Sequence, residues 1–416
     1  MTENGASFDT GVNGMIAILP DRPDFWSYSS LKEIEACPRR YALSRSSYPQ
    51  LWDGRGYPQV PATAALFGDV IHGALDRIVR ALIAAGCASP QVPTAVDVLR
   101  KLGGYTAVTE EVLAERLARL DDNPRLDIDR KRRLSRNLRD GIPEARVQVQ
   151  AYLRRITFPS AGQSGGASAE SAGVPAAGAV FGRKALGPGA YPEAPLAAEE
   201  LRLMGRVDLL QVADEHADIT DYKTGAEASS HVEQLNLYAL LWDLDAVVNP
   251  ARWPSRTLTA AYPSRDVTIH APDETELRSL EESVRRRIAQ ADAELAAEVP
   301  RAIPREETCR FCQVRQFCKE YWSKVAPDPA KLSDGALFDY QGVVGPQNGD
   351  HSWWLLGEAS KPKKLLLRTS PDTTALPMGS RIRVLGLRFD DEPEVDAPVA
   401  VMTAASETYV ATAASD

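Results

Sequence analysis

The chain has 416 residues, a formal net charge of -9 and a hydrophobic content of 44%. This length is too great for one compact core, so we expect two or three domains of an ordinary folded globular protein. The negative charge excludes nucleic-acid binding by bulk attraction, but it allows binding through a local basic groove and bound cations.

The sequence carries no sign of a membrane or secreted protein. No signal-peptide pattern opens it, and no run approaches the ~20 apolar residues that a membrane span needs. We therefore expect a cytoplasmic protein without membrane contact. The five cysteines are too few for a disulfide framework in a long chain, and in a reducing compartment clustered cysteines are more typical of a metal site.

The first part of the chain has a helical pattern after a polar start. Residues 1–24 are expected to be flexible, and a helix is predicted to begin within residues 25–45. Residues 64–86 repeat apolar side chains at helical spacing, and residues 90–158 are interpreted as a helical insertion. Residues 160–190 are rich in Ala, Gly and Ser and are predicted to form a flexible loop without a core of its own.

The middle of the chain changes from a period of 3.6 to one of two. Residues 196–224 are predicted to form two strands joined by a tight connection. Residues 231–247 return to a helical pattern, and residues 273–298 form a long amphipathic helix before the cysteine cluster. Beyond residue 331, five short strand-like runs separated by turn residues indicate a small barrel or sandwich.

Acidic and basic side chains converge in the sequence GRVDLLQVADEHADITDYKTG. Asp221 and Lys223 are two residues apart, so on a strand they share a face, and Asp208 lies on the neighbouring strand. Two rigidly held carboxylates form an oxygen-rich site for Mg²⁺ or Mn²⁺, with the backbone carbonyl of Tyr222 as a further candidate ligand. The Lys223 ammonium can orient a water or offset charge on a phosphate. The alternative is a surface hairpin with solvated charges.

Two further motifs favour a functional site. Gln234 and Tyr238 are four residues apart and therefore lie on one helical face. His72 follows Gly68 by four residues, and a histidine beside carboxylates suits Mn²⁺, although a lone helical histidine is usually a packed one. The chain has no phosphate-cradling G-x-x-x-x-G-K-[ST] motif, so any ATP-driven helicase would be a separate partner.

The order of these motifs resembles a known family. G-x3-H at Gly68–His72, G-x2-D at Gly205–Asp208, D-x-K at Asp221–Lys223 and Q-x3-Y at Gln234–Tyr238 together resemble the RecB-like nucleases of the PD-(D/E)xK superfamily. The resemblance implies an α/β restriction-endonuclease-like core, a central mixed sheet flanked by helices, over residues 25–325.

The resemblance also implies roles for individual residues. It makes His72, Asp208 and Asp221 metal ligands and Lys223 the catalytic lysine. It gives Gln234 and Tyr238 the task of ordering the site or the DNA. Family members often carry a glutamate on the preceding strand, for which Glu193 is the better match and Glu199 and Glu200 are rivals.

Three cysteines form a C-x2-C-x5-C motif at Cys309, Cys312 and Cys318, while four thiolates are needed for a tetrahedral zinc or a cubane cluster. Cys37, in ACPRRY, completes a pattern that resembles the iron–sulfur branch of the same family, which includes the AddB-type helicase–nucleases and the CRISPR-associated adaptation exonucleases. The resemblance implies a 4Fe-4S cluster on these four residues, with zinc as the competing interpretation. Cys87 is interpreted as a small apolar filler.

Two surfaces are candidates for contacts beyond the active site. Residues 129–139 (DRKRRLSRNLR) form a basic helix, which is either a solvated face or a wall that tracks phosphates. Residues 331–416 resemble an OB-like barrel, where Tyr340, Trp353 and Trp354 could stack bases and basic side chains could meet phosphates: Lys363, Lys364, Arg381 and Arg383. Adjacent residues of a strand face opposite ways, so at least one of the two tryptophans is expected in the core. Because the segment is net acidic, a role in docking a partner protein is as open as a role in binding DNA.

These patterns predict a metal-dependent nuclease that hydrolyses phosphodiester bonds. By resemblance the substrate is single-stranded DNA or DNA ends, in DNA repair, recombination or phage defence. The rival hypothesis is a catalytically inactive iron–sulfur DNA-binding or scaffold subunit of a helicase–nuclease complex. The presence of Asp208, Asp221 and Lys223 together argues against that rival.

Overall fold

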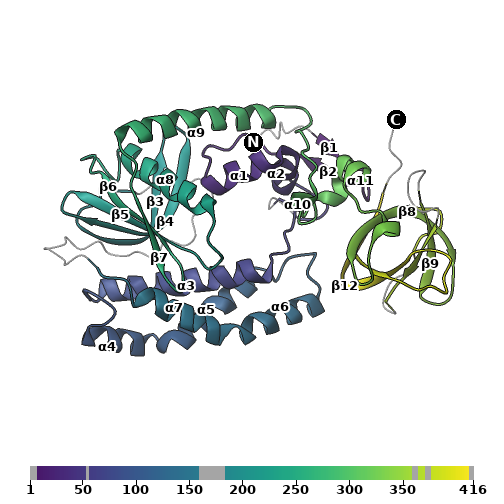
Figure 1. Cartoon of the computed structure of the whole chain (residues 1–416), viewed down its shortest axis with the longest axis horizontal. Coiled ribbons are helices and arrows are strands. Elements are labelled where there is room, and N and C mark those ends of the chain that lie inside the picture. The colour runs from purple at the N-terminus through teal and green to yellow at the C-terminus, as the bar shows by residue number, and fades with distance from the viewer. Residues whose placement is uncertain (1–6, 53–55, 159–182, 358–363, 371–375, 412–416) are drawn as a thin grey trace. The chain divides into compact units, whose positions relative to one another are not determined.

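The computed structural model describes residues 7–52, 56–158, 183–357, 364–370 and 376–411 (Figure 1). The chain divides into two compact units. The sheet unit comprises residues 23–32 and 61–292, and the barrel unit comprises residues 1–22, 33–60 and 293–416. The Ala-, Gly- and Ser-rich segment expected to be a loop lies mostly outside the described residues.

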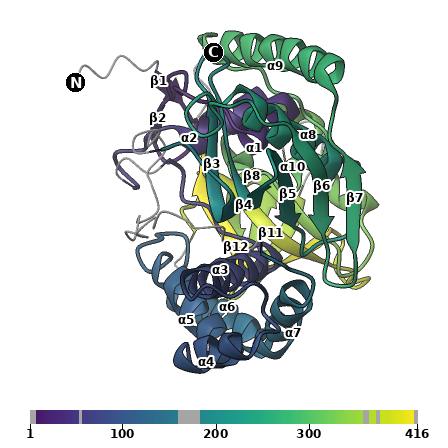
Figure 2. The same cartoon turned by 90° about the vertical axis from the view of Figure 1, so that its left-hand side faces the viewer.

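A mixed five-stranded sheet forms the centre of the sheet unit (Figure 2). Its order is β3-β4-β5-β6-β7, in which β5 and β6 are parallel and the other neighbours antiparallel. The strands are β3 (Gly189–Ala198), β4 (Leu203–Ala213), β5 (His216–Tyr222), β6 (Ser255–Ala261) and β7 (Asp266–His270). The mixed sheet with flanking helices agrees with the α/β core expected from the sequence.

The connections between the strands follow local chemistry. Asp214 and Glu215 join β4 to β5 with positive φ angles of 47° and 62°. Aspartate tolerates this conformation better than most residues, and a two-residue loop with positive φ at both positions matches the strand twist. Parallel strands need a longer crossover, and helix α8 (Ser229–Leu244) provides it between β5 and β6.

Helices pack on both faces of this sheet. Leu209, Tyr222 and Ala261 on one face join a core with the buried stripe of α3 and with α7 (Figure 1). On the other face, α8 brings Gln234 to Lys223. The other helices of the sheet unit are α3 (Thr63–Ala84), α4 (Pro93–Lys101), α5 (Gly104–Ala118), α6 (Ile128–Asp140) and α7 (Ile142–Leu153). Helices α1 (Tyr28–Ala36) and α9 (Glu274–Leu295) end beyond the bounds of this unit.

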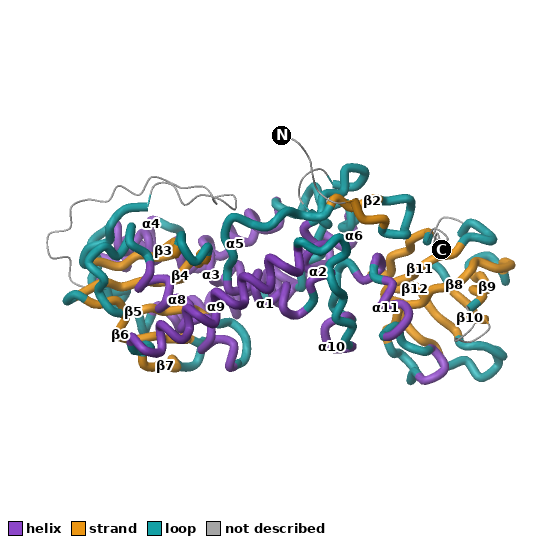
Figure 3. The backbone as a smooth tube through the Cα atoms, turned by 90° about the horizontal axis from the view of Figure 1, so that it is seen from above, coloured by secondary structure: helices purple, strands orange, loops and turns teal. Residues whose placement is uncertain are grey.

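The barrel unit contains five strands that close in the order β10-β12-β11-β8-β9 (Figure 3). They are β8 (Leu337–Gln347), β9 (Ser352–Leu356), β10 (Lys364–Arg368), β11 (Arg381–Asp390) and β12 (Val399–Val410). Alternate residues of these strands fill the interior, as the fully buried Leu355, Leu365 and Val384 show. The short helical elements of the unit are α2 (Pro38–Arg45), α10 (Glu306–Cys309), η1 (Arg315–Phe317), α11 (Lys319–Lys324) and η2 (Pro329–Lys331).

The N-terminal segment, expected to be flexible, contains folded structure from residue 7 onwards. Strands β1 (Ser7–Asp9) and β2 (Ile16–Ile18) form a short hairpin. Val12 and Ala17 are fully buried in the core of the barrel unit. The Asn13 side chain accepts the backbone N–H of Val410 at 2.8 Å, which links the hairpin to β12. The composition of this segment did not reveal these contacts because its partners lie almost 400 residues away in the sequence.

A buried carboxylate joins the barrel to the segment that follows the C-x2-C-x5-C motif. Asp339 on β8 accepts hydrogen bonds from Arg315 at 3.2 Å, from the Tyr321 hydroxyl at 2.6 Å and from the backbone N–H of Gly386 at 2.8 Å. We call these groups the Asp339 network. Because Asp339 is only 5% exposed, these donors replace the water that the carboxylate loses.

Candidate active site

The register of β4 and β5 brings the predicted carboxylates together. Leu209 pairs with Thr220, so the same register places Asp208 opposite Asp221. Asp208 Oδ2 accepts the backbone N–H of Tyr222 at 2.6 Å, which fixes its side chain across the two strands. The convergence of Asp208 and Asp221 expected from the sequence is therefore present.

Lys223 is held between the sheet and α8. Its ammonium pairs with the Asp221 carboxylate and donates to Gln234 Oε1 at 2.7 Å. Gln234 Nε2 in turn donates to the Tyr238 hydroxyl at 2.8 Å. The i, i+4 spacing of Gln234 and Tyr238 thus produces a continuous chain of polar contacts from Asp221 to the helix. From the other side of the sheet, the Tyr152 hydroxyl donates to the Lys223 carbonyl at 2.8 Å.

His72 reaches the same group from α3. Its Nδ1 lies 3.4 Å from Asp208 Oδ2. Burial lowers the pKa of His72, but the hydrogen bond to Asp208 and the negative charges of Asp208, Asp221 and Glu193 outweigh it, so the pKa is raised overall. The structure brings His72, Asp208, Asp221, Lys223, Gln234 and Tyr238 together, as their sequence motifs predict.

Tyr222 contributes its backbone at the site, while its side chain points to the opposite face. The ring packs against Tyr152, with 5.3 Å between centroids, inside the core shared with the helices. Burial raises the pKa of its hydroxyl well above the ordinary value. The side chain of Tyr222 therefore serves packing, and only its backbone borders the carboxylates.

Glu193 lies near these groups on β3. Burial first, and then the charges of Asp208 and Asp76, raise its pKa to about 7. Its φ angle of 52° is unusual for a non-glycine residue inside a strand, a conformation that costs roughly 1–3 kcal/mol. The rival residues Glu199 and Glu200 are exposed in the turn after β3. Glu193 is thus the glutamate that shares the electrostatic environment of Asp208.

Asp76 is a neighbour that the motifs did not identify. It follows His72 by four residues, so both lie on one face of α3, and it pairs with Arg80 at 2.7 Å. Burial raises its pKa, and Arg80 opposes that shift. In the sequence, only its helical spacing from His72 points to Asp76, and that spacing predicts a shared helix face but not a shared site.

Asp221 is the carboxylate most affected by its surroundings. Burial and the charge of Asp208 raise its pKa to about 6, against the opposing effects of Lys223 and His72. Its buried Oδ2 is the oxygen that pairs with the Lys223 ammonium. A divalent cation next to this carboxylate would offset the cost that burial and Asp208 place on its charge.

The glycines of the motifs allow close packing at the site. A Cβ on Gly205 would lie 3.0 Å from a ring atom of Tyr238 and 2.9 Å from Leu241 on α8. A Cβ on Gly68 would lie 2.9 Å from the Thr224 hydroxyl. Both positions therefore need the absence of a side chain, and Gly205 sets the depth at which Tyr238 lies.

The donor types fit a divalent cation, but the side chains pair with one another. His72 contacts Asp208, and Lys223 contacts Asp221, as described above. Across the part of the chain that the structure describes, no group of three or more His, Cys, Asp or Glu side chains is arranged to hold a metal ion. Oxygen and imidazole ligands suit Mg²⁺ or Mn²⁺, and binding would require these side chains to turn.

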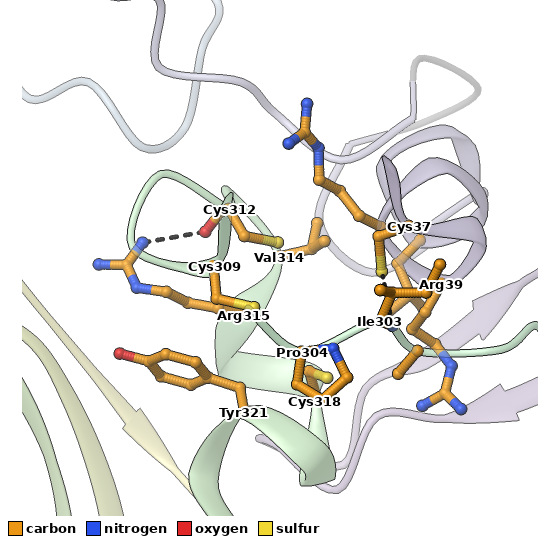
Figure 4. A pocket seen from close by; sticks show the side chains of 13 residues that line it. Cys37, Arg39, Ile303, Pro304, Cys309, Cys312, Val314, Arg315, Cys318 and Tyr321 are labelled. Carbon is orange, nitrogen blue, oxygen red and sulfur yellow. Dashed lines mark hydrogen bonds between the residues drawn. The ribbon is translucent and has the colours of Figure 1, made fainter. Parts of the chain in front are cut away.

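The four cysteines expected to form a cluster line one pocket of the barrel unit (Figure 4). Cys37, Cys309, Cys312 and Cys318 surround it, together with apolar residues such as Val314. Two of the sulfurs already accept backbone N–H groups, Cys37 from Ile303 at 3.5 Å and Cys309 from Arg305 at 3.4 Å. N–H donors of this kind are typical around cluster thiolates.

Two of these cysteines are hard to ionise as free thiols. Burial raises the pKa of Cys312 to about 11 and that of Cys318 to about 12. Cys87, in contrast, is buried in the core of the sheet unit, as expected for an apolar filler. The four pocket cysteines have the donor chemistry of a metal or cluster site, but as arranged they are not a closed ligand set.

Two of the three barrel aromatics expected to stack bases are buried. Tyr340 is fully buried and Trp353 is 7% exposed, so neither can stack an incoming base. Alternation along β9 turns Trp353 into the core and leaves Trp354 half-buried, with Lys364 Nζ at 5.0 Å from its ring centroid. Arg383 donates to the side chain of Gln341 at 2.7 Å and contacts the Gln316 carbonyl, so it joins the barrel to η1. Lys363 lies outside the described residues.

The basic helix α6 presents several arginines to solvent. Arg132, Arg133, Arg136 and Arg139 are exposed, and Leu138 packs on the core beneath them. Arg132 pairs with Asp129 at 3.4 Å, and the Asp127 side chain caps the helix through the Arg130 N–H at 2.7 Å. Local acidic residues therefore offset part of the positive charge.

Comparison with solved structures gives only weak likenesses. The tetrameric p202 HIN2 structure matches with 13% identity and a TM-score of 0.16, over 19% of this chain and 43% of that one. The p204 HINb domain matches with 10% identity and a TM-score of 0.19, over 24% and 51%. A murine DNA-binding protein bound with double-stranded DNA gives 10% identity and a TM-score of 0.17, over 54% and 95%. This chain spans about half the length of the first two, and scores this low support no conclusion about fold or function.

Comparison with curated proteins gave no match. No helix among the described residues is long and apolar enough to cross a membrane. A comparison with protein families, however, matches residues 25–319 to the PD-(D/E)XK nuclease superfamily. This match covers more than two thirds of the sequence and includes every residue of the carboxylate–lysine site. The chain therefore belongs to the PD-(D/E)XK nuclease superfamily.

Proposed function

We propose that this protein is a Mg²⁺- or Mn²⁺-dependent deoxyribonuclease that hydrolyses phosphodiester bonds in single-stranded DNA or at DNA ends. Membership of the superfamily indicates a metal-dependent nuclease. The observation that carries the proposal is the convergence of Asp208, Asp221 and Lys223, with Lys223 held by Gln234 at 2.7 Å. Carboxylates and an ammonium at one point are the groups that metal-assisted hydrolysis requires.

Each residue has a distinct role in this proposal. His72, Asp208, Asp221 and the carbonyl of Tyr222 would hold the cation. A bound divalent cation polarises the phosphoryl oxygen and lowers the pKa of water. Lys223 orients the attacking water and offsets charge on the phosphate. Gln234 holds Lys223, and Tyr238 holds Gln234, so both keep the ammonium in place.

The decisive test is a cleavage assay on labelled single-stranded, duplex and circular DNA with Mg²⁺ or Mn²⁺. Asp221→Ala and Lys223→Ala should each reduce the rate by about 100-fold or more, because each removes a group that acts on the reacting phosphate. Asp218→Ala is the matched control, since Asp218 lies on the same strand but pairs with Arg256 at 3.1 Å. Equal and metal-independent cleavage by all four proteins would refute the enzymatic role.

One observation favours an inactive scaffold subunit as the second candidate. The side chains of the site pair with each other, and the described residues contain no preformed group of three metal ligands. An inactive subunit would bind DNA, and its affinity would not change when Mn²⁺ is added. The cleavage assay above separates the two candidates, because only the enzyme turns over.

We further propose that Cys37, Cys309, Cys312 and Cys318 hold a 4Fe-4S cluster, as in the iron–sulfur branch of RecB-like nucleases. Their shared pocket and the N–H donors to two sulfurs support this assignment. Cys37→Ser should remove visible absorbance and iron, while Cys87→Ser, in the other unit, should retain both. Stoichiometric zinc in a colourless protein would assign the site to zinc instead.

The barrel is proposed to be OB-like. Its third and fifth strands, β10 and β12, are parallel neighbours, and its first strand, β8, pairs with both β9 and β11. We propose that residues 331–416 form this domain beside a nuclease domain over residues 25–325. It would grip DNA or dock a partner such as a separate helicase. A cytoplasmic role in DNA repair, recombination or phage defence fits these properties.

A further inference from the structure

A second hollow lies beside the carboxylate–lysine group in the sheet unit. It has a volume of about 290 Å³ and is bordered by β6, β7 and the start of α8. This is near the lower end of the range for small-ligand pockets. Its lining includes His231, Val232, Ala260, Tyr262, Val267 and Ile269. None of these residues has a role in the proposed chemistry.

Strand pairing connects this pocket directly to the active site. Asp221 pairs with Ala260 across β5 and β6, and Ala260 pairs with Val267 across β6 and β7. Paired residues of neighbouring strands point to the same face, so the three form one row across the sheet. Because strands are about 4.8 Å apart, Val267 lies roughly 10 Å from Asp221. The pocket therefore lies on the same face of the sheet as Asp221.

The lining combines apolar walls with an aromatic pair. His231 Nδ1 and the Tyr262 hydroxyl lie 2.6 Å apart, which fixes both rings at one side of the pocket. Val232 is 40% exposed, and Val267 and Ile269 are half-buried. The acidic rim residue Glu227 is paired with Arg265 at 2.8 Å, so its charge is offset. This surface suits a flat, uncharged ring system with polar edges.

We propose that this pocket receives an unpaired nucleobase next to the scissile phosphate. The proposal rests on the nuclease function and specifies its substrate. A separation of roughly 10 Å between Val267 and Asp221 is within the reach of a nucleotide close to the cleaved bond. A base stacked inside a duplex cannot enter, because it must first leave its neighbours at a cost of a few kcal/mol. Contact through ring faces and apolar walls is tolerant of sequence. The pocket therefore favours single strands and frayed ends over continuous duplex.

The test uses two substitutions on the same edge strand. Val267→Trp fills the pocket, while Thr268→Trp adds the same bulk one residue later, where the exposed side chain points to the other face and pairs with Thr259. The probe is a single-stranded oligonucleotide with 2-aminopurine at successive positions, whose fluorescence falls when the base stacks on an aromatic ring. Binding is measured on the full chain in buffer without divalent cations, so no bond is cut.

We expect wild type and Thr268→Trp to quench 2-aminopurine at one preferred position. Val267→Trp should abolish that quenching and weaken single-strand binding by about tenfold. With Mg²⁺ or Mn²⁺ present, the preferred position should lie within two nucleotides of the cleaved bond. Quenching that is position-independent, or equal in the two variants, would overturn the proposal.

The design separates this proposal from the nuclease assignment. If no metal supports cleavage, the nuclease function fails, while the metal-free fluorescence still decides whether the pocket takes a base. If Val267→Trp changes the oligomeric state in light scattering and leaves quenching intact, the pocket holds a protein surface and the nucleobase proposal is wrong. If an equally labelled continuous duplex quenches as strongly as the single strand, the preference for unpaired bases is wrong.

Discussion

The carboxylate of Asp221 carries an electrostatic cost in the metal-free protein. Burial and Asp208 raise its pKa to about 6, well above the ordinary value of 3.8. A carboxyl group whose folded pKa is raised destabilises the fold once it ionises. The contribution of Asp221 to the free energy of unfolding is therefore most favourable below about pH 4, and it is lost as the pH rises from about 4 to about 6.

We predict that Asp221→Asn raises the melting temperature of the metal-free protein at pH 8 by about 3 °C or more, because the neutral amide avoids this cost. The gain should be smaller at pH 5, where part of the wild-type carboxyl is protonated. Thermal unfolding with a chelator at both pH values checks this, with Asp218→Asn as control. A wild-type protein that is more stable than Asp221→Asn at pH 8 would contradict the prediction.

The same substitution should also remove the response to metal. Mn²⁺ binds the folded wild-type protein and stabilises it by mass action, so it should raise the wild-type melting temperature at pH 8. Asp221→Asn lacks a ligand and should show little or no shift at the same concentration. Equal shifts for both proteins would show that the cation binds elsewhere.

At the scale of elements, α8 is positioned by the absence of a side chain at Gly205. We predict that Gly205→Ala destabilises the sheet unit by about 1–3 kcal/mol, because the new Cβ would meet Tyr238 and Leu241. The displaced Tyr238 would loosen Gln234, so the cleavage rate should fall as well. Chemical denaturation measures the first effect. Gly187→Ala is the control, because its Cβ would meet no atom within 4 Å.

Helix α6 provides a second test at this scale. If it tracks phosphates, Arg132→Ala together with Arg136→Ala should lower the slope of log K against log salt for single-stranded DNA by about 1.4, which corresponds to two lost contacts. The control changes two exposed arginines of α9, Arg278 and Arg285, which pair with glutamates one turn away. An unchanged slope in the α6 variant would identify the helix as a solvated face.

At the scale of the whole molecule, the Asp339 network makes the barrel part of a larger unit. We predict that Asp339→Ala destabilises the barrel unit by about 3–5 kcal/mol, because it leaves the largely buried Arg315 guanidinium without its carboxylate partner. The variant should unfold at lower temperature and be cut faster by protease between residues 325 and 337. Asp396→Ala, whose side chain is fully exposed, is the control. Equal stability of the two variants would show that the barrel is held by other contacts.

Local patterns predicted much of this architecture. The apolar spacing of residues 64–86 corresponds to α3, and the alternation around Asp221 corresponds to β5. The tight connection after β4 also follows in part from local preference, because Asp214 tolerates positive φ. These features depend on neighbours within a few positions, which a single sequence displays directly.

Long-range contacts could not be predicted in the same way. The backbone of Glu193 adopts positive φ inside a strand, which no local preference favours. Asp76 enters the electrostatic environment of Glu193 only because α3 packs near β3. Asp339 resembles an ordinary polar strand residue in the sequence, yet it is buried by partners from β11, η1 and α11. Tertiary packing decides these positions.

The discontinuity of the barrel unit has a consequence during protein synthesis. Cys37 precedes Cys309 by 272 positions. At roughly 5–20 residues per second, a ribosome would produce Cys309 about 14–54 s after Cys37. The stretch 61–292 emerges within that interval, so the nascent sheet unit can fold while the N-terminal hairpin and Cys37 wait for their partners. Translation that stops before residue 309 would leave Cys37 without the three later cysteines of its pocket. If the proposed cluster is present, it can be completed only after about three quarters of the chain has been made.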